Sequence, residues 1–126
     1  MIVLKTRKEV ELMRDAGSLL ASVLERMEDM ASPGMTTGEL DREADRIIRE
    51  AGGIATFRGQ GGMVKHAPPY PAASCISINE QVIHGIPSDR RIKEGDLISI
   101  DCGVTLHSLI ADSALTFVVG RAAPEV

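Results

Sequence analysis

Leu97-Ile98-Ser99-Ile100-Asp101-Cys102 is the stretch of this 126-residue chain that says most about its fold. Apolar and polar side chains alternate along it, which is the pattern of a β-strand whose successive residues point to opposite faces. Ser99 and Asp101 should therefore lie on one face of a sheet, and the two isoleucines should lie on the other with Cys102. The stretch predicts a strand with one polar and one apolar face.

A second strand-like run, Ala111–Thr116, carries Asp112. We expect a turn region centred on Gly103 and a further short run to connect it with the first strand. If the two runs pair antiparallel, Asp101 and Asp112 can project from the same side of the sheet. Two close carboxylates repel each other, so the pair either keeps a proton or binds a cation, and hard divalent metals accept carboxylate oxygens. The spacing alone also allows two ordinary turn or strand-end acids.

Two helices should precede these strands, because two capping boxes occur, in which a Thr and a Glu three residues later each satisfy a free backbone N–H. These pairs are Thr6 with Glu9 and Thr36 with Glu39. Apolar residues at helical spacing predict a first helix to about Met30 and a second that ends at Gly52-Gly53. The predicted apolar stripes are Val10, Met13, Leu20, Leu24 and Met27, then Leu40, Ala44, Ile47, Ile48 and Ala51. We interpret the charged residues of the second helix as its solvated face: Asp41, Arg42, Asp45, Arg46 and Glu50.

After the helices the pattern changes to short β-like runs separated by Gly- and Pro-containing segments. The predicted strands are Ile54–Phe57, Ala73–Ile78, Leu97–Cys102 and Ser113–Val119, with a loop over 59–71. Two helices followed by strands without βαβ alternation indicate one α+β domain with a largely antiparallel sheet.

Composition narrows the class of protein. A formal charge of -4 argues against direct nucleic-acid binding, which normally needs a basic face. No stretch approaches the roughly 18 apolar residues of a membrane helix, and the N-terminus lacks the long apolar segment of a signal peptide. We therefore expect a cytoplasmic protein that does not enter a membrane.

The histidine and cysteine residues add one candidate site residue. His84 stands just before a Gly-Ile-Pro sequence, where the backbone turns sharply, so its ring could face a cleft and donate to a substrate. A packed, hydrogen-bonded histidine is the alternative, and we interpret His66 and His107 as surface residues. Cys75 and Cys102 form no Cys-x-x-Cys pair, so we expect two small buried hydrophobic residues, with neither zinc thiolates nor a disulfide.

Four blocks of the sequence stand out together: Cys75-Ile76-Ser77-Ile78-Asn79-Glu80, His84-Gly85-Ile86-Pro87, Gly95–Asp101 and Asp112-Ser113. With the gap between the two aspartates, they resemble the bacterial type I methionine aminopeptidases. The N-terminal segments Ile2–Thr6, Met13–Gly17 and Thr37–Asp41 look similar too. The resemblance covers nearly the whole chain, and the combined motif is highly specific.

The resemblance implies the pita-bread fold, in which two α+β halves enclose a dinuclear metal site. It implies that Asp101 chelates one metal ion and that Asp112 bridges both. It further implies that His84 is catalytic and binds the substrate, and that Tyr70 and Cys75 help to line the methionine pocket. An apolar slot suits a thioether side chain.

The implied function is that of a metallo-aminopeptidase, which removes the initiator methionine from nascent proteins with water activated by two divalent metal ions. Manganese, iron, cobalt or zinc would suit such ligands. The family's site also needs a histidine and two glutamates from a second half. Residues 1–126 correspond to the N-terminal half of the catalytic domain, so we expect the isolated chain to be incomplete and inactive unless a separate C-terminal half is its partner. The resemblance also suggests the ribosome as a partner.

Some positions depart from the family pattern and bear on the shape of the pocket. The loop at residues 61–69 looks longer than usual, Gln60 stands where an aromatic residue is common, and Ile110-Ala111 replaces a His-Gly pair. Two alternatives stay open: a pita-bread peptidase that cleaves Xaa-Pro bonds, and a non-catalytic binding module or inactive fragment. Retention of both aspartates with His84 counts against the binding module.

Overall fold

A computed structural model describes residues 1–61, 67–121 and 124. Along the chain, the helices α1 (Arg7–Met30) and α2 (Thr37–Glu50) precede four strands. These are β1 (Ile54–Ala55), β2 (Ser74–Ile78), β3 (Leu97–Leu106) and β4 (Leu109–Val118). The predicted α+β class is confirmed, although β1 is shorter than the run predicted from the sequence. Neither of the helices that the structure describes has the length and apolar character needed to span a bilayer.

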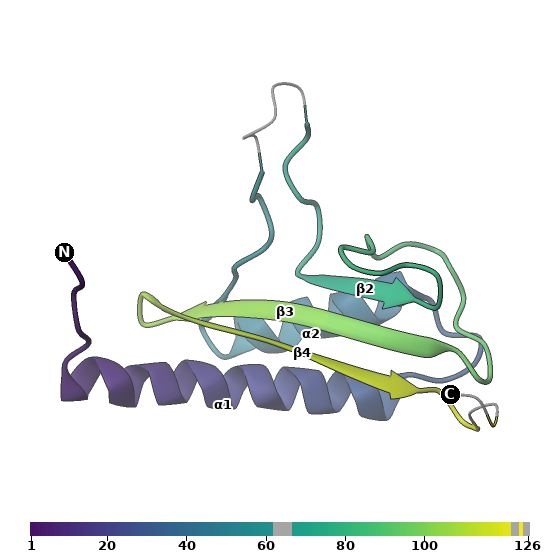
Figure 1. Cartoon of the computed structure of the whole chain (residues 1–126), viewed down its shortest axis with the longest axis horizontal. Helices are drawn as coiled ribbons and strands as arrows, with labels where there is room; N and C mark the ends of the chain where they lie inside the picture. The colour runs from purple at the N-terminus through teal and green to yellow at the C-terminus, as the bar shows by residue number, and fades with distance from the viewer. Residues whose placement is uncertain (62–66, 122–123, 125–126) are drawn as a thin grey trace.

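The sheet is built around β3 and is antiparallel throughout. β1 and β2 pair with different parts of one edge of β3, and β4 pairs with the other edge along its whole length. The helix α1 contacts β3 and β4, whereas α2 contacts β1 and β2. In Figure 1, α1 runs along the length of the sheet below β3 and β4. One face of the sheet is therefore covered by helices.

The apolar face predicted for the central strand is the covered one. Ile98, Ile100 and Cys102 are fully buried in a core that also takes in residues of both helices, whereas Ser99 and Asp101 are only partly buried. The helical stripes are confirmed in part. Their buried members are Leu20, Leu24, Met27, Leu40, Ala44 and Ile48. Val10 and Met13 are exposed, and the first buried residue of α1 is Ala16.

Both predicted helix starts are confirmed as capping boxes. The Glu9 N–H donates to Thr6 Oγ1 over 3.2 Å, and the Thr6 N–H donates to Glu9 Oε2 over 2.7 Å. Thr36 and Glu39 form the same reciprocal pair. At the other end of α2 the cap residue is Ala51, and the following Gly52 has φ +77°, a conformation that favours glycine.

The connection between the last two strands differs from the prediction. Gly103 does not turn the chain, since it lies within β3 opposite Asp112. The turn is instead the two-residue connection His107-Ser108, with φ +51° and +64°. Two consecutive positive φ values are typical of the tight hairpin turn that matches strand twist. His-Ser is not the usual Asn-Gly or Asp-Gly signature of such a turn, so the residue types at 107 and 108 do not predict it.

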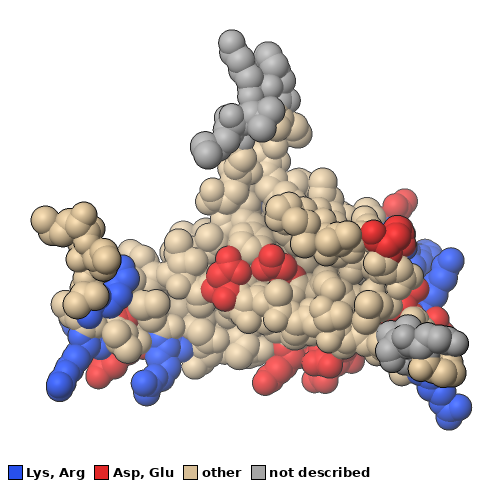
Figure 2. Space-filling model, in the orientation of Figure 1, with Lys and Arg blue, Asp and Glu red and all other residues tan. Residues whose placement is uncertain are grey.

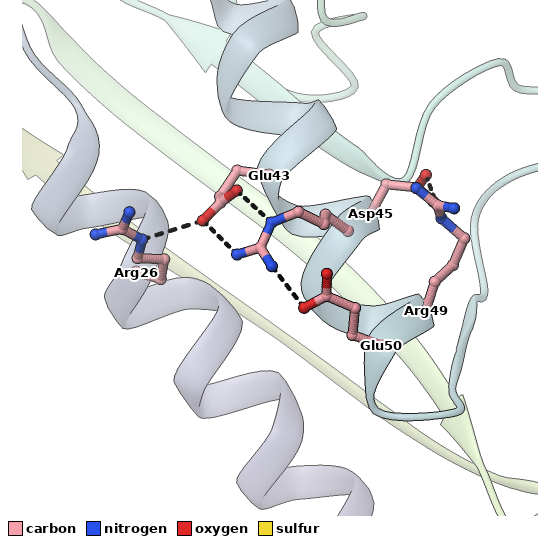
Figure 3. A network of polar contacts seen from close by, with 6 residues as sticks. Arg26, Glu43, Asp45, Arg49 and Glu50 are labelled. Carbon is pink, nitrogen blue, oxygen red and sulfur yellow. Dashed lines mark hydrogen bonds and ion pairs between the residues drawn. The ribbon is translucent and has the colours of Figure 1, made fainter.

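The charged face of α2 is largely as predicted. Figure 3 shows Glu43 of α2 paired with Arg26 of α1. Glu43 also pairs with Arg46 over 2.8 Å, and Arg46 contacts Glu50. Asp45 pairs with Arg49 over 3.0 Å. These groups are at least partly exposed, and such surface pairs contribute little to the stability of a fold.

Asp41 is a correction to that prediction, because its side chain is buried and not solvated, with only 7% exposed. Its carboxylate accepts hydrogen bonds from the Ser74 N–H at 2.8 Å, the Ser74 hydroxyl at 2.7 Å and the Ala73 N–H at 3.3 Å. The residue therefore ties α2 to the beginning of β2. A buried carboxylate with three donors is well compensated for its lost hydration.

Candidate functional site

The two candidate carboxylates lie on the same face of the sheet. In the β3–β4 register, Asp101 stands opposite Ala114, and Asp112 stands opposite Gly103. The aspartates are therefore diagonal neighbours on two adjacent antiparallel strands, a relation that brings Cβ atoms within roughly 7–8 Å. The predicted projection from one side of the sheet is confirmed. That side is opposite to the face carrying the buried isoleucines.

Gly103 gives this face room for an aromatic ring. A Cβ atom added to Gly103 would lie 2.8 Å from Cε1 of Phe57, closer than side-chain contacts allow. Because Asp101, Gly103 and Asp112 share a face, the Phe57 ring packs on the side that carries the carboxylates. Phe57 is not among the predicted site residues, and its only distinguishing signal in the sequence is that the chain has just three aromatic residues, two Phe and one Tyr.

A cavity of about 380 Å³ opens beside Asp101 and brings several predicted residues together. Its lining consists of Phe57, Gln60, Gly61, Tyr70, Cys75, His84, Ile86 and Asp101. The lining is mainly apolar, with a few polar groups at defined positions, which is typical of a small-molecule or side-chain pocket. Asp112 does not line this cavity. Gln60, which differs from the family pattern, does line it. Residues 62–66, which include His66 and most of the longer loop, lie outside the described residues.

Tyr70 holds the wall of the cavity through its hydroxyl. This hydroxyl donates to the Ser74 carbonyl over 2.9 Å and lies 3.4 Å from the Gly85 carbonyl. Burial is the main cause that raises the pKa of Tyr70 well above its ordinary range, and the neighbouring Cys75 is the second cause. The phenol therefore stays a neutral donor. Both cysteines are buried and free, as predicted. Burial is also the main cause that raises the pKa of the Cys75 thiol.

His84 lies at the rim of the cavity in an unusual backbone conformation. Its φ is +58°, in the left-handed region that non-glycine residues seldom adopt. The side chain is exposed, whereas the following Gly85 is buried. His107, interpreted as a surface residue, is exposed in the β3–β4 turn.

The surroundings of Asp101 disfavour its negative charge. Burial, and then the negative charge of Asp112, raise the pKa of Asp101, and His84 opposes this shift. Figure 2 shows acidic side chains in the middle of the face on which β3 and β4 lie in Figure 1, whereas Lys and Arg side chains lie towards its edges. A bound divalent cation would relieve this repulsion.

The fit to a metal is that of an incomplete ligand set. Within the ranges 1–61 and 67–121 and at residue 124, no three His, Cys, Asp or Glu side chains come together in a group that could hold a metal ion. Asp101 and Asp112 supply hard oxygen donors from one side only. They suit divalent metals, but further ligands would have to face them from elsewhere.

Comparison with known proteins places the chain in a family. The family model described as "Metallopeptidase family M24" matches residues 11–126. The methionine aminopeptidase of Clostridium acetobutylicum is 44% identical over 126 residues, which cover 99% of this chain and 48% of that protein. Methionine aminopeptidase 1 of Bacillus subtilis is 40% identical over 121 residues, or 96% of this chain and 46% of the relative. The chain thus spans about half the length of the curated relatives it matches.

Solved structures agree with the sequence comparison. The methionine aminopeptidase of Rickettsia prowazekii matches with a TM-score of 0.89 and 33% identity, over 99% of this chain and 48% of that one. The enzyme of Thermotoga maritima matches with a TM-score of 0.88 and 34% identity, over 98% and 47%. A prolidase from Pyrococcus horikoshii has the same fold at a TM-score of 0.79 but only 20% identity, over 98% of this chain and 32% of that one. The described half-fold is the N-terminal half of the pita-bread fold.

Proposed function

The chain belongs to metallopeptidase family M24, and from that premise we propose that it supplies part of the active centre of an enzyme that removes N-terminal methionine. Relatives 40–44% identical to the chain bear the name methionine aminopeptidase. The observation that carries the proposal is the placement of Asp101 and Asp112 on one sheet face, with an apolar cavity beside Asp101.

In this proposal Asp101 and Asp112 bind two divalent metal ions, drawn from manganese, iron, cobalt or zinc. When bound, such ions polarise the scissile carbonyl and make water nucleophilic near neutral pH. The aspartates fix the charge and position of that centre from the β3–β4 side. Asp112, the more exposed of the two, is free to contact more than one ion, whereas Asp101 faces the cavity.

The remaining residues bind and orient the substrate. The mainly apolar cavity accepts the methionine side chain, because Tyr70 and Cys75 stay uncharged and present a polarisable, water-poor surface. In this proposal His84 hydrogen-bonds the peptide group next to the scissile bond, and its position in the lining of the same cavity as Asp101 supports that role. Binding the side chain in the cavity would then hold the scissile carbonyl near the carboxylates.

The rest of the ligand set would come from the second half of the fold, which corresponds to the part of the relatives that this chain does not match. That half could follow in the same polypeptide or be a separate partner. We further propose that the substrates are nascent polypeptides with N-terminal methionine, that the ribosome is a partner, and that the enzyme acts in the cytoplasm. These points rest on the family relationship.

Metal-dependent thermal stabilisation tests the proposal in a joined protein, defined here as residues 1–126 followed by the C-terminal half of the Clostridium acetobutylicum relative. Manganese at about 100 times its dissociation constant should raise the unfolding free energy by about 2.7 kcal/mol. Asp112→Asn should remove most of this gain, because the amide keeps the shape but loses the charge. If none of manganese, iron, cobalt and zinc raises the melting temperature of the joined protein above its metal-free value, the non-catalytic binding module is favoured.

A further inference from the structure

The peptide backbone of Gly85 is held against the outer edge of β2. The Ile76 N–H donates to the Gly85 carbonyl over 2.8 Å, and the Gly85 N–H donates to Ser77 Oγ over 3.0 Å. Ser77 itself is only 3% exposed. A Cβ atom on Gly85 would lie 2.2 Å from the Ile76 carbonyl oxygen, so this close approach requires glycine. Both the N–H and the carbonyl group of Gly85 are therefore held by hydrogen bonds to β2.

Among the residues that the structure describes, Gln81 is hydrogen-bonded to Ile78 at the end of β2, but residues 82–84 make no such bond. Val82 and Ile83 are exposed by 84% and 69%, and the His84 side chain is exposed as well. Even so, His84 has the left-handed φ of +58°. Such conformations of non-glycine residues persist where the surrounding structure over-determines them. The anchored Gly85 follows His84 directly, whereas the anchored Gln81 lies three residues before it.

The direction of the His84 ring matters because two hollows meet at this residue. One is the cavity of about 380 Å³ that holds Tyr70 and Cys75, and the other is a smaller hollow of about 110 Å³ next to Ser99. Both are lined by His84 and Asp101. A change in the His84 backbone would alter which of these two hollows the imidazole ring points into.

We propose that Ser77 is a positioning residue for His84. Its buried hydroxyl accepts the Gly85 N–H and so keeps the preceding residue in the left-handed conformation that places the imidazole at the cavity. The catalytic consequence rests on the proposed function, whereas the effect on the His84 backbone does not. The rival role for Ser77 is a purely structural one, in which its hydroxyl only satisfies a buried donor.

Thr37 offers a matched control for that structural role. Its side chain is 2% exposed, and its Oγ1 accepts the Ser88 N–H over 2.9 Å, in the same loop as Gly85. Thr37→Val removes this acceptor, and with it the 3.3 Å hydrogen bond that the hydroxyl donates to the Ser88 carbonyl, with little change in the size of the side chain. It therefore imitates the loss of a buried hydroxyl acceptor at a point where the proposal assigns no effect on His84.

The first readout is NMR spectroscopy of the 126-residue chain. In Ser77→Ala, the Gly85 amide should exchange with solvent faster, and the His84 Cα shift and its amide-to-Hα coupling should leave their left-handed values. Thr37→Val should leave those His84 signals unchanged. Unchanged His84 signals in Ser77→Ala, despite faster exchange at Gly85, would overturn the proposal.

The second readout is methionine release by the joined protein. Ser77→Ala should lower kcat on the order of tenfold, with KM changed by less than about twofold, as loss of support behind a contacting residue does. Ser77→Thr retains the hydroxyl and should keep kcat close to that of the unaltered joined protein. Ser77→Val has the shape of threonine without the hydroxyl and should lower kcat, so this pair keeps the test valid if Ser77→Ala folds poorly. An equal loss of kcat in Thr37→Val would overturn the proposal. If the unaltered joined protein releases no methionine, the proposed function fails while the NMR comparison still decides the role of Ser77.

Discussion

Asp101→Asn should reduce methionine release by the joined protein at least about 10³-fold, since metal-based charge stabilisation contributes several kcal/mol to such reactions. Asparagine keeps the size and shape of the side chain but cannot bring a negative charge to the metal centre. The residue is partly buried, lies on the same sheet face as Asp112 and lines the cavity of about 380 Å³. Initial rates with saturating manganese measure the effect.

The same variant provides its own folding control in the metal-free 126-residue chain. Burial and Asp112 raise the pKa of Asp101 above its ordinary value of 3.8, so the folded state holds this proton more tightly than the unfolded state does. The wild type should therefore lose stability relative to Asp101→Asn as the pH rises from about 3.8 through the raised pKa. Melting curves at pH 3.5 and pH 7 should show that the stability of the variant relative to the wild type is greater at the higher pH.

Two outcomes would contradict this account of Asp101. One is a stability difference between the variant and the wild type that does not change with pH. The other is an equal loss of methionine release in Asp29→Asn, which changes an exposed aspartate of α1 and serves as the matched control. A variant that is inactive with metal yet more stable than the wild type without it would separate function from folding.

Asp41→Ala should cause the largest loss of stability, about 3 kcal/mol or more. It removes the carboxylate that accepts hydrogen bonds from three donors at the start of β2, namely two backbone N–H groups and the Ser74 hydroxyl. Each buried donor left unsatisfied costs roughly 1–3 kcal/mol, against a total stability of about 5–15 kcal/mol for a typical domain. Urea unfolding of the 126-residue chain measures the difference.

Asp45→Ala on the same helix is the matched control for Asp41→Ala. Asp45 is partly exposed and pairs with Arg49 and Arg58 at the surface. Loss of such pairs costs up to about 1 kcal/mol. Equal destabilisation by the two substitutions would show that burial of the Asp41 carboxylate does not have the structural importance that its hydrogen bonds indicate.

The sequence predicted the features that depend on local patterns. Thr6 and Thr36 sit three residues before a glutamate, and a capping box needs nothing further from the rest of the chain. Strict alternation around Asp101 likewise decides which face of β3 is polar. Pairing of that strand with the Asp112 run then follows from antiparallel geometry.

The features that were missed depend on contacts between distant segments. Asp41 follows the spacing of a solvated helix face, and only its contact with Ser74, 33 residues away, makes it a buried acceptor. The role of Phe57 requires the space at Gly103, which was itself interpreted as a turn. Ser77 has the pattern of an ordinary strand residue until its bond to the Gly85 N–H is known.

Release of free methionine from the peptide Met-Ala-Ser, with and without manganese or cobalt, tests the central claim most directly. We predict no release by the 126-residue chain alone, and metal-dependent release by the joined protein that stops when the metal is chelated. Release by the joined protein that persists after chelation would contradict a metal centre built on Asp101 and Asp112. Robust metal-dependent release by the 126-residue chain alone would contradict the claim that it supplies only part of that centre.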